Sequence, residues 1–358
     1  MTTDRIRVLD LFAGAGGLTA GFHEASARFT TIKAVEMDVA AAASYEATFG
    51  KGTTYAGPIH SWLLEGELPK NVDVVVGGPP CQGFSTLGKQ NVEDARNTLW
   101  RQYAETIKRT QPKYFVVENV AAFARSQQYE DFKRETSMQG DLAEYDFDFK
   151  VLNSADYGAA QNRRRAVLIG HHRDLAPPGF PIATHTKAQH LTVRDVLRNV
   201  AWSTNDTELP VDRNVEFGGK ILQGSFKASE LHLGRNYAEL SLRRFEAIPK
   251  GGNRFNLPED LKAECWKQHT TGSADVMGRL HWDKPSVTIR TEFFKPEKGR
   301  YLHPEAMRAI THYEAALLQG FPISHRFVGS KTAIARQIGN AVPIPLGSAI
   351  ARQLEKVL

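Results

Sequence analysis

Short apolar runs alternate with amphipathic stretches over the first half of the chain. Runs rich in β-branched residues predict strands at 7–12, 31–36, 72–76, 114–118 and 166–170. Helical patterns lie between these runs, and strands that alternate with helices are typical of a parallel sheet. The predicted fold class is therefore α/β, with a mostly parallel sheet and helices on both of its faces.

The pattern changes after residue 200. From 201 to 282, turn residues multiply and the helical period fades, which predicts a smaller, irregular domain. Amphipathic periods return at 306–318 and 345–354, and both predict helices. We therefore divide the chain into a first domain at 1–200, an irregular domain at 201–282, and a segment at 283–358 that returns to the first domain.

Composition and charge are those of an ordinary soluble protein. Of the 358 residues, 41% are hydrophobic and 24% are charged. No apolar run approaches the roughly 20 residues of a membrane span, and the first residues lack a secretion signal, so we expect a cytoplasmic protein with no membrane partner. Net charge is 45 − 40 = +5, and 11 basic residues against 6 acidic ones fall in 281–358. This excess permits a polyanionic partner without requiring one.

One of the two cysteines directly follows an apolar strand. The strand at 72–76 is followed by two glycines, two prolines and then Cys81. Ligands of an open α/β sheet bind at this carboxyl edge, so we interpret Cys81 as a presented nucleophile. The alternative is a small buried hydrophobic side chain. Two cysteines provide neither a disulfide framework nor metal-ligand spacing, so no metal is expected, and Cys265 is expected to be an inert buried thiol.

A glycine-rich turn at residues 12–22 follows the first strand and opens a helix. Glycines let the backbone approach a ligand closely, and a helix N-terminus can face it. Glu36 comes about twenty residues later, where an acidic side chain can accept hydrogen bonds from both hydroxyls of a ribose. Because the turn lacks the ending of a phosphate-binding loop, a cofactor with a ribose and no pyrophosphate is favoured. The alternative is a turn that only packs the helix on the strand.

Two further polar groups stand near predicted strand ends. Glu118 ends its strand and should project into a partly dry site suited to proton donation. The alternative is an incidental glutamate before a helix N-cap. In an extended segment, Gln161, Arg163 and Arg165 would share one face. Massed arginines indicate a phosphate or carboxylate partner, although a solvated charged face is the ordinary explanation for a basic run.

Five segments, in order along the chain, resemble the motifs of the DNA (cytosine-5)-methyltransferases of bacterial restriction-modification systems. They are residues 10–18, 78–85, 118–120, 161–165 and 337–343. The resemblance implies the Rossmann-like fold of S-adenosylmethionine-dependent methyltransferases, with S-adenosyl-L-methionine as cofactor and double-stranded DNA as substrate. It also implies that 1–200 is the catalytic and cofactor-binding domain and that 201–282 is the target recognition domain.

The resemblance implies a role for each catalytic residue. Cys81 would add to carbon 6 of a flipped-out cytosine, so that carbon 5 can attack the methyl group. Glu118 would donate a proton to ring nitrogen 3. Arg165 would hold the exocyclic oxygen of the base, and Arg163 would orient the base or its phosphate.

Similarity also implies contacts to the cofactor, and similarity and charge together suggest contacts to DNA. The cofactor-binding residues implied are Phe12, Ala13, Gly14, Gly16, Leu18, Glu36, Met37, Ile59, Pro79, Asn340 and Val342. The DNA-binding residues expected are Gln82, Ser85, Gln161, Arg290, Lys295, Lys298 and Arg300. Two positions depart from the family pattern. Pro58 replaces an aspartate that binds the adenine amino group, and Tyr313 replaces an arginine that supports the recognition region.

Three alternative functions are open. A nicotinamide-dependent dehydrogenase would share the glycine turn and Glu36 but would leave Cys81 unexplained. An RNA cytosine-5 methyltransferase of the same superfamily would keep the chemistry and lack a large recognition region. A non-enzymatic DNA-binding relative would be expected to have lost Cys81 or Glu118, and both are present. We expect a monomer. A cognate endonuclease or a defence system, if present, is expected to act as a separate protein.

Overall fold

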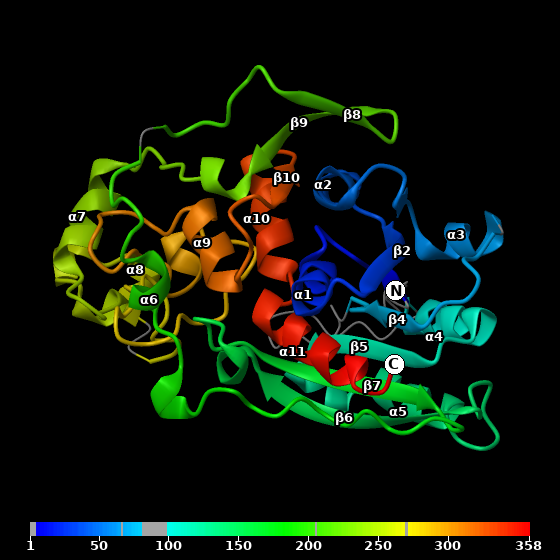
Figure 1. Cartoon of the computed structure of the whole chain (residues 1–358). Helices are drawn as coiled ribbons and strands as arrows, with labels where there is room; N and C mark the ends of the chain where they lie inside the picture. The colour runs from blue at the N-terminus through cyan, green and yellow to red at the C-terminus, as the bar shows by residue number, and fades with distance from the viewer. Residues whose placement is uncertain (1–4, 66, 81–98, 205, 269–270) are drawn as a thin grey trace.

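A seven-stranded sheet forms the centre of the protein (Figure 1). The structure, a computed structural model, describes residues 5–65, 67–80, 99–204, 206–268 and 271–358. The strand order is β3-β2-β1-β4-β5-β7-β6. The strands are Ile6–Leu11 (β1), Phe29–Glu36 (β2), Thr54–Ala56 (β3), Val74–Gly77 (β4), Tyr114–Val120 (β5), Tyr145–Asn153 (β6) and Arg164–His172 (β7).

The register of the strands brings several strand ends to one edge of the sheet. Strands β1 to β5 are parallel, with Leu11 paired to Gly77 and Gly77 paired to Val117. Strand β7 runs antiparallel to β5 and β6, and its Arg165 pairs with Val120 at the end of β5. The carboxyl ends of β1, β4 and β5 therefore lie beside the amino end of β7.

Helices cover both faces of the sheet because its central strands are apolar on both sides. The helices around the sheet are Gly17–Ala25 (α1), Val39–Phe49 (α2), Ile59–Glu65 (α3), Leu99–Thr110 (α4), Gln127–Glu135 (α5) and Ile344–Glu355 (α11). Val75 packs in the cluster formed with α3, α4 and α5, whereas Val74 and Val76 pack in the cluster formed with α1 and α11.

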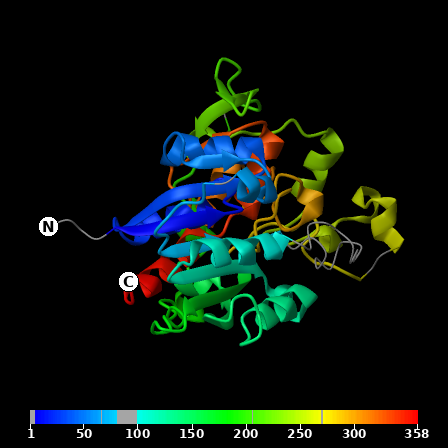
Figure 2. The same cartoon turned by 90° about the vertical axis from the view of Figure 1, so that its right-hand side faces the viewer.

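An irregular region lies beside the sheet. Its elements and their neighbours are Val193–Leu197 (α6), Asn214–Phe217 (β8), Lys220–Lys227 (β9), Glu239–Ala247 (α7), Glu264–Gln268 (α8), His312–Gln319 (α9), Arg326–Val328 (β10) and Lys331–Asn340 (α10). Figure 1 shows α7 and α8 on the left, with α9 and α10 between them and the sheet. The β8–β9 hairpin pairs with β10 and projects at the top of both views (Figures 1 and 2).

The C-terminal segment runs from this irregular region back to the sheet. In Figure 2 the last helix, coloured red, lies next to the blue start of β1. A Cβ on Gly21 of α1 would lie 2.7 Å from the backbone nitrogen of Ser348 in α11, so this close helix contact requires glycine. Leu318 of α9 and Ile338 of α10 share one apolar core with Phe226 of β9. The segment at 283–358 thus contacts both parts of the molecule.

The five predicted strands are present, and β3 and β6 add to them. In β6 the exposed residues Asp146, Asp148 and Lys150 alternate with less exposed ones, so charge interrupts the apolar run that would have marked a strand. No helix in the described part of the chain is long and apolar enough to cross a membrane.

The helix predicted at 306–318 begins only at His312. Thr311 caps it, because the Thr311 hydroxyl accepts the Glu314 N–H at 3.1 Å and the Glu314 carboxylate accepts the Thr311 N–H at 2.8 Å. The helix predicted at 345–354 is α11, which is one residue longer at each end.

Candidate active site

The carboxyl edge of the sheet holds the candidate active site. Three residues expected there lie outside the described residues: Cys81, Gln82 and Ser85. The described chain reaches Pro80. Pro79 is buried, and its carbonyl accepts a hydrogen bond from Asn119 Nδ2 at 3.0 Å. The segment that leads into Cys81 is therefore fixed to the end of β5.

Glu118 is the buried carboxylate of this edge. Its side chain is 10% exposed, and its Oε1 lies 2.8 Å from Arg165 Nε on the neighbouring strand. The pair is an ion contact and not an aligned hydrogen bond, so the buried Oε1 has no hydrogen-bond donor among the described residues. The Arg165 cation compensates the charge of this oxygen, and a ligand N–H that reached it would supply the aligned hydrogen bond that it lacks.

Gly78 leaves space for that carboxylate. A Cβ at this position would lie 3.1 Å from both the Glu118 carbonyl oxygen and Oε2, which is tighter than ordinary contact. Arg165 also donates Nη1 to the Arg164 carbonyl at 2.8 Å, which fixes the plane of its guanidinium group. The edge therefore presents a carboxylate and a cation beside the chain that enters Cys81.

The glycine turn and Glu36 lie at neighbouring strand ends. Glu36 Oε2 accepts the Gly14 N–H at 2.8 Å, and Oε1 accepts the Asp38 N–H at 2.7 Å. Burial raises the pKa of the Glu36 carboxyl. Gly14 and Gly16 have φ of 57° and 84°, and a Cβ on Gly16 would lie 2.2 Å from the Phe49 ring. Glycine is therefore required where the turn bends.

The C-terminal segment closes against this turn. A Cβ on Gly17 would lie 3.0 Å from both Ala341 Cβ and the Val342 carbonyl oxygen. Val342 packs in the same apolar cluster as Leu18, while Asn340, at the end of α10, is exposed. The sequence places these residues more than 300 positions apart, and the fold brings them together.

Other cofactor candidates differ in exposure. Phe12 packs in the apolar cluster that contains Ile59, and Ala13 is buried. Met37, in contrast, is 67% exposed. Pro58 is exposed and has neither an N–H donor nor a side-chain acceptor, so the structure offers no replacement for the family aspartate at this position.

Asp10 is a buried carboxyl that sequence reasoning did not single out. It is 1% exposed at the end of β1, and Thr19 Oγ1 donates to its Oδ2 at 2.6 Å. Burial raises the pKa of Asp10 to about 7, against the opposing effect of the Thr19 hydrogen bond. Tyr45 lies 2.8 Å from the same hydroxyl. The detectable signal was an acidic residue inside the otherwise apolar run at 8–12.

Comparison with known proteins decides the family. The family model of the C-5 cytosine-specific DNA methylases matches residues 6–356. The chain belongs to this family. It is a DNA (cytosine-5) methyltransferase, as the five sequence motifs predict.

The methyltransferase is similar to Type II methyltransferases over nearly its whole length. It is 33% identical to M1.HphI of Haemophilus parahaemolyticus over 356 residues, 98% of this chain and 86% of the relative. It is 32% identical to the Type II methylase M.HgiDII of Herpetosiphon aurantiacus over 368 residues, 98% of this chain and 95% of the relative.

Solved structures share the fold of the methyltransferase. A DNA modification methyltransferase encoded within an Escherichia coli prophage superposes with a TM-score of 0.72 at 23% identity, covering 98% of this chain and 99% of that one. The Schizosaccharomyces pombe Dnmt2 methyltransferase gives a TM-score of 0.56 at 16% identity, covering 99% and 98%. These likenesses support the predicted α/β methyltransferase fold.

Arg163 and Gln161 of the methyltransferase point inward, which differs from the contacts expected for them. Arg163 is 3% exposed, and its Nη1 and Nη2 donate to the carbonyls of Ile289 and Gly339 at 2.8 and 2.9 Å. Gln161 is fully buried and donates to Gln319 Oε1 at 2.8 Å. Burial lowers the pKa of Arg163. These contacts anchor the C-terminal segment and leave neither side chain free for a phosphate.

Four basic residues were expected to grip DNA, and the structure separates them. Arg290 is exposed. Lys295 and Lys298 both reach the Glu292 carboxylate, at 2.5 and 3.6 Å, and are partly exposed. Arg300 is different, because its guanidinium donates to the carbonyls of Gly251, Gly252, Ala274 and Arg279. Arg300 is thus an internal brace, and the expected phosphate contact is not compatible with these bonds.

Arg308 and Tyr313 support the region that the family arginine would hold. Arg308 Nη1 and Nη2 each donate to the Glu314 carboxylate at 2.8 Å in a buried bidentate pair. The Tyr313 N–H donates to the Leu231 carbonyl at 3.1 Å, and its ring meets His232 edge-on at 6.0 Å. Support for the irregular region is therefore present without the arginine.

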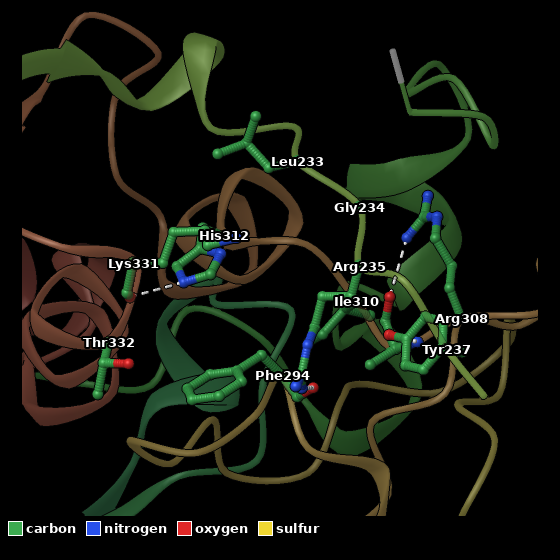
Figure 3. Close-up of a pocket in the computed structure, with 11 residues that line it drawn as sticks. Leu233, Gly234, Arg235, Tyr237, Phe294, Arg308, Ile310, His312, Lys331 and Thr332 are labelled. Carbon is green, nitrogen blue, oxygen red and sulfur yellow. Dashed lines mark hydrogen bonds between the residues drawn. The ribbon is translucent and has the colours of Figure 1, made fainter. Parts of the chain in front are cut away.

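A cavity of about 170 Å³ lies beside Arg308 (Figure 3). Arg235, Phe294 and His312 line it, together with Lys331 at the start of α10. Figure 3 shows His312 turned toward Lys331, whose carbonyl accepts the His312 Nε2–H at 2.8 Å. Lys331 Nζ in turn contacts Glu208 at 2.9 Å. The polar groups of His312 and Lys331 are therefore already paired, as expected where helices pack against each other.

The second cysteine differs from expectation. Cys265 is exposed, not buried, because it lies on the short helix α8 at the surface. The described residues contain no group of three or more histidine, cysteine or carboxylate side chains that could hold a metal ion.

Proposed function

We propose that this protein transfers a methyl group from S-adenosylmethionine to carbon 5 of a cytosine in a specific double-stranded DNA sequence. The observation that carries the proposal is the buried pair of Glu118 and Arg165, 2.8 Å apart, beside the segment fixed by Pro79 that leads into Cys81. Relatives over the whole chain are Type II methyltransferases, which favours DNA over RNA as the substrate.

Each side chain has a defined task in this proposal. Cys81 adds as a thiolate to carbon 6 of the flipped-out base, and Glu118 provides a proton at ring nitrogen 3. Arg165 holds the exocyclic oxygen and keeps the carboxyl group in place. After methylation the carbon 5 proton leaves to water, the Cys81 thiolate is eliminated, and the proton on ring nitrogen 3 returns to the Glu118 carboxylate. The buried Glu118 Oε1, without an aligned donor, is the acceptor or donor that such a base would engage.

The residues at the glycine turn fit the cofactor. Gly14 leaves open space beside its backbone where the turn bends, and Glu36 ends the next strand with both oxygens near the turn. Each Glu36 oxygen accepts one backbone N–H and retains a lone pair for a ribose hydroxyl. Val342 and Asn340 close the opposite side. When bound, S-adenosylmethionine supplies an electrophilic methyl group.

We also propose that residues 201–282 read the DNA sequence and that Arg290, Lys295 and Lys298 contact phosphates. Support comes from the irregular build of this region and from its neighbouring cations, since Arg290 and Lys298 are exposed and Lys295 is partly exposed. Phosphate contacts position a duplex, while base contacts specify it. We propose that the protein acts as a monomer and protects host DNA, beside a separate endonuclease or within a phage-defence system. The support is its similarity to Type II methyltransferases over nearly its whole length.

A mechanism-based trap tests the chemistry. Duplex DNA with 5-fluorocytosine at the target, incubated with S-adenosylmethionine, should give a complex that survives denaturation, because fluorine cannot leave as a proton does. Cys81→Ser should abolish the complex. Cys265→Ser is the matched control, since this exposed thiol has no assigned role, and it should trap as wild type does. An adduct that persists in Cys81→Ser would exclude the assignment.

A second experiment tests the recognition region. Bisulfite sequencing of DNA from cells that express the protein gives the methylated sequence. Replacing residues 201–282 with the corresponding region of a relative of different specificity should redirect that sequence and keep the Cys81 adduct. Methylation that stays at the original sequence would place recognition elsewhere in the chain.

A further inference from the structure

His325 links the C-terminal segment to the glycine turn. It lies between α9 and β10, is 2% exposed, and its Nε2 lies 3.0 Å from the Ala15 carbonyl oxygen, 310 positions earlier in the chain. A carbonyl oxygen can only accept, so Nε2 carries the proton and donates it. Burial lowers the pKa of His325 to about 4, which keeps the ring neutral at physiological pH.

Aromatic rings fix the position of this imidazole. Phe321, Phe327 and Phe49 surround it, with ring centroids at 4.6, 4.9 and 5.9 Å. The Phe49 ring is also the group that a side chain on Gly16 would strike. One face of the turn therefore rests on Phe49, and one of its carbonyls is held by His325.

The remaining backbone groups of the turn show what this bond leaves available. The Gly14 N–H goes to Glu36, and the Gly16 N–H goes to the Ala13 carbonyl at 2.9 Å. The Ala15 N–H has no hydrogen-bond partner within the part of the chain that the structure describes. Anchoring the Ala15 carbonyl limits rotation of the peptide group that joins Ala15 to Gly16.

We propose that His325 is a positioning residue for cofactor binding: its Nε2–H fixes the Ala15 carbonyl and so holds the glycine turn in the shape that accepts the cofactor. The inference rests on the proposed function, because it takes S-adenosylmethionine to be what the turn binds. His325 acts through Ala15 and does not touch the reacting atoms.

Two substitutions separate the hydrogen bond from the packing. His325→Phe keeps a ring and removes the donor, whereas His325→Gln keeps an amide N–H near the position of Nε2. Calorimetry of the full-length proteins with S-adenosylmethionine should show about 3- to 10-fold weaker binding for His325→Phe, the range expected when one hydrogen bond is removed. His325→Gln should bind within about 2-fold of wild type.

A matched control excludes a general loss of stability. His312 is likewise buried, has its pKa lowered to about 4, and donates Nε2 to a carbonyl at 2.8 Å, but that carbonyl belongs to Lys331. His312→Phe should lower the melting temperature and leave cofactor affinity unchanged. The kcat of His325→Phe at saturating cofactor should stay near wild type, with the whole defect in KM for the cofactor.

The outcomes distinguish the two proposals. If the wild-type protein binds S-adenosylmethionine and His325→Phe binds it equally well, the role of His325 alone is overturned. His325→Gln that binds as weakly as His325→Phe would have the same consequence. Wild-type protein that binds no S-adenosylmethionine would overturn the proposed function as well. Should His325→Phe fail to fold, the smaller donor-free His325→Leu replaces it with the same expected result.

Discussion

The sheet edge and the irregular region satisfy their backbone polar groups in different ways. At the edge, parallel and antiparallel ladders pair the backbone, and Glu118 projects from the end of a strand that is already satisfied. In the irregular region, arginine side chains bond the backbone. Arg279 donates to the carbonyls of Phe245, Ile248, His303 and Ala306. Arg300 donates to the carbonyls of Gly251, Gly252, Ala274 and Arg279.

This difference shows that a basic residue has two distinct uses in one protein. A buried carbonyl in a loop without a ladder needs a donor, and a guanidinium group can supply several at once. Arg279 is 3% exposed for this reason, whereas Arg290 is exposed and unlike it in surroundings. Counting positive charge in such a region therefore overstates the number of groups available to DNA.

The largest effect is expected at the sheet edge. Glu118→Gln keeps a hydrogen-bonding group but cannot give up a carboxyl proton, so methylation should slow by about 10²- to 10⁴-fold. Single-turnover methylation measures this rate, and calorimetry should find cofactor affinity nearly unchanged. An equal loss of cofactor binding would show that Glu118 is structural. The sheet edge and the irregular region would then not differ in the way described above.

The next effect is expected in the irregular region. Arg279→Leu leaves the carbonyls of Phe245, Ile248 and His303 without their donor, and should lower the free energy of unfolding by roughly 3 kcal/mol. DNA affinity should fall, while S-adenosylmethionine should still bind at the sheet edge. Arg243→Leu is the control: Arg243 pairs with Asp260 at the surface, and its removal should change stability by less than about 0.5 kcal/mol.

Calorimetric titration with each ligand would decide the Arg279 experiment. Loss of cofactor binding together with DNA binding would mean that the two regions unfold as one unit, and that the arginine network is not confined to the region it braces.

Acid should weaken the segment that joins the two regions. His303, His312 and His325 are buried with their pKa values lowered from 6.5 to about 4. As pH falls from 6.5 towards 4, the unfolded chain takes up these protons first, so stability is lost in this window. Asp10 acts in the opposite direction, because its pKa is raised from 3.8 to about 7 and the folded chain keeps that proton.

For these four groups the net difference is about two protons, 3 − 1 = 2, which corresponds to a loss of about 2.7 kcal/mol per pH unit. The raised pKa of Glu36 reduces this loss, whereas the lowered pKa values of His23, His171 and His281 add to it. Urea midpoints at pH 7.5, about 6.5 and about 5.5 measure the effect. A midpoint that rises on acidification would show that the carboxyl groups outweigh the histidines.

The smallest effect concerns exposed charge. Lys295→Gln with Lys298→Gln should weaken binding to all DNA sequences alike. The substitutions should also shallow the salt dependence, by up to about 0.9 log units for each phosphate that the protein no longer neutralises. Lys108→Gln is the control and should leave the slope unchanged, because it removes a partly exposed lysine on α4 that pairs with Asp141. Weaker binding of the target sequence alone would instead indicate that these lysines contact bases and help to recognise the sequence.

The sequence predicts the sheet well because the forces that build it are local and periodic. Three consecutive valines and two glycines define β4 and its end, and Glu118 is predictable as a strand-end carboxylate for the same reason. The alternation that puts Gln161, Arg163 and Arg165 on one face is confirmed, since the first two are buried and Arg165 is partly buried, while Asn162 and Arg164 are exposed.

The partners of these side chains are not predictable in this way. Arg163 bonds carbonyls more than 100 positions away, and a basic run carries no signal for distant acceptors. Arg300 was expected on a phosphate and braces a loop, and Cys265 was expected inside and lies outside, because tertiary packing decides both. His325 had no motif around it at all, and only the fold brings it to Ala15.

Ala15 is synthesised early, whereas His325, which binds its carbonyl, is synthesised 310 positions later. Residues 8–20 leave the ribosome long before residues 325–355, which supply the helix that packs on α1 and the histidine that holds the turn. A nascent chain that has reached only residue 300 would therefore carry the complete set of catalytic side chains with an unsupported turn. Methylation would begin only after α11 has been made, and fragments that stop before His325 would be inactive without losing a single catalytic residue.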